Sequence, residues 1–139
     1  MEKLQRLYYK FLSSGNALQV YENGEQIFVS NSQMLAPLLE YIEIFAPHHQ
    51  KVVIFDKVMG NAAALLCVKT NCSEVYSPLG SELAVKTLNK YGIIYHITQI
   101  VSYIQKAGLV EMCPMERLSI DKNPEEFYQI VKINNQKTK

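Results

Sequence analysis

The pattern of apolar and polar positions divides the chain into alternating helices and strands. Apolar residues at helical spacing predict an amphipathic helix within 1–14, ending near Gly15. Two short strands, 17–21 and 26–30, flank an Asn-Gly pair, which tolerates the positive φ of both central turn positions. These strands are expected to form an antiparallel hairpin. A second helix is expected over about 37–45.

The middle of the chain predicts a buried strand that leads into a tightly packed helix. Residues 51–55 are apolar after the first position, as in a central strand covered by helices on both faces. Asp56 and Lys57 end this strand, and a loop containing Gly60 follows. The next helix, over about 61–69, carries three consecutive alanines, so it can approach the sheet closely.

Further strands and helices alternate towards the C-terminus. The expected order is a strand, a turn, a helix, a strand and a short helix, namely 74–77, 78–80, 81–91, 93–97 and the residues up to Gly108. Proline at the first helical position and glutamate at the third predict a helix starting at Cys113-Pro114. The same signal predicts a last helix over about 124–134.

This order of elements predicts an α/β fold with three layers, helix–sheet–helix. The right-handed crossover rule makes the later strands parallel to one another, beside the antiparallel hairpin. The length of 139 residues fits a single domain spanning 1–139. Its core is expected over about 17–118, between the N-terminal helix and the C-terminal one.

Composition excludes several classes of protein. A net charge of +1 argues against a nucleic-acid binder, which needs a basic face. The longest apolar run, 62–68, is too short to span a membrane, and no signal peptide is expected. Three cysteines without framework spacing fit a reducing compartment, so a cytoplasmic location is expected. Self-association is plausible for such a fold, but no residue demonstrates it.

The strand end and the helix start around residue 60 form the first candidate site. Ligands favour the carboxyl ends of strands in open α/β sheets, which makes Asp56 and Lys57 candidates for acid/base or anchoring roles. A solvated charge pair is the alternative. Gly60 and Asn61 could present backbone N–H groups to a ligand, or the glycine could serve only the turn and close packing.

Four other residues are weaker candidates. Cys113 could be a nucleophile activated by a helix start, although a small buried or capping residue explains it better. Glu116 could be a general base, and a capping-box glutamate explains it equally well. Ser77 and Ser81 flank a strand-to-helix turn and could contact a ligand, with helix capping the better explanation for Ser81.

Two of these segments together resemble an uncharacterised bacterial and archaeal domain family whose members are similar to cytidine deaminases in fold. The segments are Asp56 to Leu66 and Met112 to Glu116, and the resemblance covers about 17–118. It implies a mixed five-stranded sheet with helices on both faces. It also implies a nucleoside or nucleotide as ligand.

The deaminase reaction does not follow from this resemblance. Zinc deaminases need H-x-E at one helix start and P-C-x-x-C at the next. No H-x-E occurs here, and Cys113-Pro114 reverses the P-C order without a partner cysteine. His48 and His49 fit a solvated loop and His96 a strand, so no metal ligand and no cofactor is expected.

Three functions therefore compete. The first is a small-molecule binding domain with a deaminase-like pocket and no zinc ligands. The second is a metal-independent enzyme that uses Asp56, Lys57, Cys113 or Glu116. The third is a non-catalytic interaction module. A deep pocket containing these polar groups would favour the first two, and a filled pocket with an exposed apolar patch would favour the third.

Overall fold

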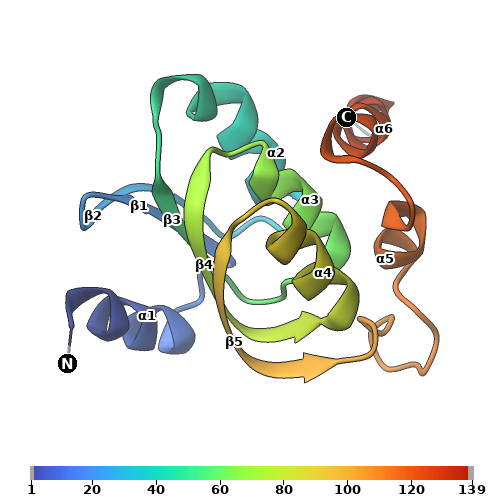
Figure 1. The fold of residues 1–139 in the computed structure, drawn as a ribbon, viewed down its shortest axis with the longest axis horizontal. Coiled ribbons are helices and arrows are strands. Elements are labelled where there is room, and N and C mark those ends of the chain that lie inside the picture. The colour runs from blue at the N-terminus through green and yellow to red at the C-terminus, as the bar shows by residue number, and fades with distance from the viewer. Residues whose placement is uncertain (1, 138–139) are drawn as a thin grey trace.

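The computed structural model describes residues 2–137, with side chains through residue 133, and these residues build a mixed five-stranded sheet flanked by helices (Figure 1). The strands are β1 Leu18–Glu22, β2 Glu25–Ser30, β3 Val52–Asp56, β4 Cys72–Ser81 and β5 Ile94–Val101. Their order across the sheet is β2-β1-β3-β4-β5, so β3 is the central strand. β1 is antiparallel to both β2 and β3, whereas β3, β4 and β5 run parallel. The structure confirms the predicted mixed sheet.

The predicted turn joins β1 and β2. Asn23 has φ 52° and Gly24 has φ 81°, the positive values that a tight hairpin turn between two strands requires. The hairpin places β1 beside β3, where Leu18 is opposite Asp56.

Helices cover both faces of the sheet. They are α1 Lys3–Ser13, α2 Ala36–Ile44, α3 Asn61–Val68, α4 Glu82–Lys90, α5 Pro114–Ser119 and α6 Pro124–Lys137, with a 3-10 turn η1 at Ala46–His48. Figure 1 shows α1 on one side of the sheet and α3 and α4 on the other. Neighbouring residues of a strand point to opposite faces, and β3 shows the division: Phe55 belongs to the cluster that includes Tyr8 and Phe11 of α1, whereas Ile54 belongs to the larger core. None of the described helices is both long and apolar enough to cross a membrane.

β4 is longer than expected, because the segment predicted as a turn at 78–80 continues the strand. Pro78 lacks an N–H, but the pairing of β3 with β4 ends at Phe55 and Tyr76, so no bond to β3 is lost there. Gly80 lets the backbone of β4 pack closely against Ile97 and Met59. A Cβ at this position would lie 2.8 Å from Ile97 Cδ1 and 3.1 Å from the Met59 carbonyl oxygen.

The prediction of a short helix that ends at Gly108 is wrong. β5 extends to Val101, where its register with β4 still holds. The chain then forms a small hairpin over 104–113, closed by an antiparallel bridge between Gln105 and Met112 and by a 2.7 Å bond from Cys113 N–H to the Ile104 carbonyl. We call this segment the 104–113 hairpin.

Candidate functional site

An open cavity of about 390 Å³ lies at the carboxyl end of β3. Its walls come from the start of α3, the 104–113 hairpin, α5 and the residues that precede α2. Most of the lining is apolar and includes Met34, Ala62, Ala63, Ile104 and Met115. We call this space the Asp56 cavity, because it is the apolar setting of that carboxyl group.

Asp56 reaches the cavity because it is the last residue of β3, whose preceding residues are held in the sheet by β1 and β4. One carboxylate oxygen, Oδ1, accepts a hydrogen bond from Val58 N–H at 3.3 Å. None of the ion pairs among the described residues includes Asp56. Its carboxylate therefore has little to stabilise the charged form.

Burial raises the pKa of Asp56 to about 7, and the backbone N–H groups of Val58 and Lys57 offset this only in part. Because the cavity opens to solvent, the residue as a whole is only half-buried. The protein around it still desolvates the carboxyl group. At neutral pH, Asp56 can thus act either as a hydrogen-bond acceptor or, when protonated, as a donor.

Lys57 contributes to the same lining, but its charge points elsewhere. The ammonium donates to the Ser14 carbonyl oxygen at 2.9 Å and lies 4.7 Å from the centre of the Phe11 ring, in a cation–π contact. Phe11 belongs to the core under α1, on the opposite face of the sheet. This geometry favours an anchoring role for Lys57 at the end of α1.

Glu116 also borders the cavity, yet its carboxylate is fully engaged. Oε1 accepts from the N–H of Asn61 at 2.6 Å and from the Ser81 hydroxyl at 3.1 Å. Oε2 accepts from the N–H of Ile104. The side chain is only 2% exposed. Glu116 therefore joins α5 to the first turn of α3, to the end of β4 and to the 104–113 hairpin.

Gly60 and Asn61 form the start of α3, as the sequence predicts. A Cβ on Gly60 would lie 3.0 Å from Ile104 Cγ1 and 3.3 Å from Glu116 Oε1, so the glycine permits close packing. The N–H of Asn61 is taken by Glu116, and its side chain bonds Ser119 and Thr87. Gly60 lines the cavity, whereas Asn61 does not.

Neither predicted serine lines the cavity. Ser81 caps α4 by accepting from Ala84 N–H at 3.1 Å, which confirms its predicted capping role. Ser77 donates to the Leu79 carbonyl at 2.9 Å within β4. Both are completely buried. A direct ligand contact by either serine stays a prediction that this geometry does not favour.

Cys113 lines the cavity together with Asp56. It precedes Pro114 and occupies the N-cap position of α5, without a side-chain capping bond. The thiol is partly exposed and free. The structure thus brings the candidates Asp56, Cys113 and Gly60 to one cavity, although Asp56 and Cys113 are 57 residues apart in the sequence.

Sequence reasoning missed two parts of the lining. Met34 has φ 57° and a 75% exposed side chain at the cavity. The 104–113 hairpin supplies Ile104, Gln105 and Ala107. Gly108 could have signalled a turn, because glycine favours turns, and in the structure it has φ 74°.

Residues 2–137 contain no group of three or more His, Cys, Asp or Glu placed to hold a metal ion. Two histidines are each paired with a glutamate. His49 bonds Glu22 at 3.0 Å, and His96 of β5 bonds Glu74 of β4. Neither pair borders the Asp56 cavity.

The chain is similar to proteins of one family. Residues 8–134 match the TM1506 family, described as a domain of unknown function (DUF1893). A solved structure of a DUF1893 family protein, TM1506 from Thermotoga maritima, superposes with a TM-score of 0.86 at 26% sequence identity, covering 96% of this chain and 92% of that one. The comparison with curated proteins gave no match. Since the family match spans nearly all of the sequence, the chain belongs to the TM1506 family of domains of unknown function.

Proposed function

We propose that this protein binds a small molecule in the Asp56 cavity and that Asp56 anchors it. The observation that carries the proposal is a carboxyl group, without an ion-pair partner among the described residues, in a mostly apolar cavity. A few polar groups set in an apolar pocket are the usual make-up of a ligand site. A carboxyl group whose pKa lies near neutrality can exchange hydrogen bonds with a ligand in either protonation state.

Two considerations support a nucleoside or nucleotide as the proposed ligand class. The resemblance to cytidine deaminases in fold implies a nucleoside or nucleotide, and 390 Å³ lies within the range of small-molecule pockets. An amino group beside a ring nitrogen, as on cytosine or adenine, can pair with a carboxyl group. The residues at the α3 start, Gly60 and Asn61, provide no zinc ligand. The proposal is therefore binding without zinc-dependent deamination.

A metal-independent enzyme is the second candidate, and the observation that favours it is Cys113 in the same cavity as Asp56. A thiol nucleophile and a proton donor could act on one ligand. Of the four predicted catalytic residues, Lys57 and Glu116 have their charged groups engaged by protein atoms. Asp56 and Cys113 are the pair with groups available to a ligand. The open cavity speaks against the third alternative, a non-catalytic interaction module with a filled pocket.

A thermal-shift screen tests the binding proposal. Purified protein is screened with nucleosides and nucleotides, and each hit is titrated against wild type, Asp56→Asn and Asp121→Asn. Asp121 is exposed and lies outside the cavity, which makes it a matched control. The readout is the ligand-induced shift in Tm of each variant, so a change in the stability of the free protein does not interfere.

We expect a hit that stabilises wild type and Asp121→Asn equally. Asp56→Asn should bind at least about 10-fold more weakly, because a hydrogen bond to a charged group contributes about 1.5–3 kcal/mol. Equal shifts in all three proteins would remove Asp56 from the site. A screen without any hit would contradict the nucleoside class.

A further inference from the structure

A second concave surface lies on the other side of the 104–113 hairpin and α5, which form one wall of the Asp56 cavity. It is a groove of about 430 Å³ between the 104–113 hairpin, α5 and the turn that follows α5. Alternate residues of this wall serve the two spaces: Gln105 and Ala107 line the cavity, whereas Lys106 lines the groove. The two spaces have no lining residue in common.

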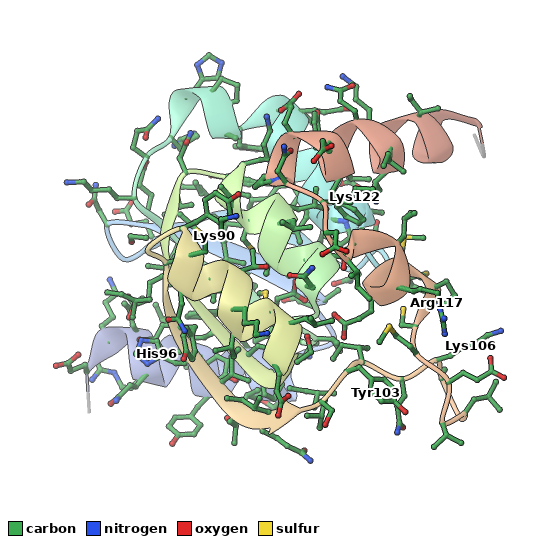
Figure 2. All side chains as sticks on the ribbon, turned by 45° about the vertical axis from the view of Figure 1, so that its right-hand side comes forward. Lys90, His96, Tyr103, Lys106, Arg117 and Lys122 are labelled. Atoms are coloured by element: carbon green, nitrogen blue, oxygen red, sulfur yellow. The ribbon has the colours of Figure 1, made fainter. Side chains whose placement is uncertain are left out.

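Three cations border the groove: Lys106 from the hairpin, Arg117 from α5 and Lys122 from the turn after α5. Figure 2 shows their labelled side chains in the right-hand half of the molecule. No ion pair of the described residues includes any of them. By contrast, Lys69 pairs with Glu125 elsewhere on the surface.

One carboxylate, Glu111, also lines the groove. The lining therefore carries three positive charges and one negative charge. Three cations drawn from three segments into one hollow repel one another, and an anion placed between them would relieve this repulsion. An arginine guanidinium offers a planar pair of donors that matches a phosphate oxyanion, and lysines add point charge.

We propose that this groove binds a phosphate group, either as free phosphate or on a small molecule. The concave shape and the chain's net charge of +1 favour a small anion over a nucleic acid, which would need an extended basic face. The site is separate from the Asp56 cavity, so it does not depend on the function proposed above.

The test is a titration with inorganic phosphate by calorimetry at constant ionic strength, with sodium chloride as the balancing salt. Ribose 5-phosphate and ribose form parallel arms that distinguish free phosphate from a phosphate carried on a sugar. The variants are Arg117→Gln, Lys122→Gln and Glu111→Gln. Lys86→Gln on α4 is the matched control, because Lys86 is exposed and lies outside the groove.

We expect Arg117→Gln to weaken phosphate binding at least about 10-fold, the loss of a charge-assisted bidentate contact. Lys122→Gln should weaken it by a smaller factor, and Glu111→Gln should strengthen it by removing the one negative charge of the lining. Lys86→Gln and Asp56→Asn should bind as wild type does. An unchanged affinity in Arg117→Gln and Lys122→Gln, or binding of a single-stranded RNA oligonucleotide without phosphate binding, would overturn the proposal.

Discussion

Two carboxyl groups border the same cavity, and their hydrogen-bond partners separate their roles. Glu116 accepts bonds from two backbone N–H groups and a hydroxyl, so nearly all of its capacity serves the fold. The Asp56 carboxylate accepts from the backbone N–H of Val58 at 3.3 Å, and the backbone N–H of Lys57 also acts on it. A ligand would gain far more from Asp56 than from Glu116, because only the former has oxygens available to it.

Asp56 should make stability depend on pH. Its folded-state pKa of about 7 lies above the ordinary value of 3.8, so between about pH 4 and 7 the folded protein holds a proton that the unfolded chain has lost. The stability that the protonated Asp56 carboxyl group contributes is fully present below about pH 4 and is lost as pH rises through 7. As pH rises from 5 to 8, the free energy of unfolding of Asp56→Asn should therefore increase relative to that of wild type by on the order of 1–2 kcal/mol. This figure is reduced for solvent screening at the open cavity.

Urea unfolding of both proteins at several pH values measures this difference. Asp121→Asn corrects for the loss of one surface carboxylate. A difference between Asp56→Asn and wild type that stays constant from pH 5 to 8 would show that the Asp56 carboxyl group has an ordinary pKa.

At the scale of elements, two similar helix starts show what the local sequence can and cannot predict. Both α5 and α6 begin with proline, and each has a glutamate at the third helical position. In α6, Asn123 and Glu126 form the reciprocal capping bonds, at 2.8 and 3.0 Å. In α5, Glu116 turns away from its own helix and caps α3 instead. The sequence predicts both starts, but the partner of Glu116 depends on which helix packs beside it.

Glu116 should be more important for stability than Glu126. Glu116→Ala would leave three donors without their acceptor, two of them backbone N–H groups near the cavity wall, and should cost about 3 kcal/mol or more. Glu116→Gln keeps one acceptor oxygen and should cost less. Glu126→Ala, an exposed capping change, should cost about 1 kcal/mol. Chemical denaturation measures all three, and equal losses in Glu116→Ala and Glu126→Ala would contradict the bridging role.

The strands show the same limit. The apolar run 51–55 and the Asn-Gly turn have strong local signals, and both elements form as predicted. The extension of β5 to Val101 and the 104–113 hairpin have weak signals, because these residues are mostly exposed and gain their order from β4 and Glu116. The cavity wall could therefore not be predicted, although Asp56 and Cys113 could be proposed.

At the scale of the whole molecule, the sheet separates the candidate site from α1. Tyr8, Phe11, Tyr21, Phe55 and Tyr76 form a separate aromatic core beneath α1. The Asp56 cavity and the groove bordered by Lys106, Arg117 and Lys122 lie among the helices and the hairpin of the other face. Lys57 connects the two regions, since it lines the cavity while its ammonium contacts Phe11 and Ser14.

Phe11→Ala should lower stability without altering phosphate binding in the groove, since neither Phe11 nor Lys57, which contacts the Phe11 ring, lines it. Phe11 is fully buried and lies 5.7 Å from the Phe55 ring centre, so its truncation should cost about 3–5 kcal/mol. Phosphate binding measured well below the Tm of the variant should stay within twofold of wild type. A large loss of affinity in the folded variant would show that the two faces are coupled.

The central claim is that Asp56 occupies an apolar ligand cavity, and the pH titration of its carboxyl carbon by 13C NMR tests it most directly. Asp56→Asn assigns the signal. We predict a midpoint near 7, shifted when a hit from the nucleoside screen is added. A midpoint near 4 that stays unchanged when this hit is added at a saturating concentration would contradict the account.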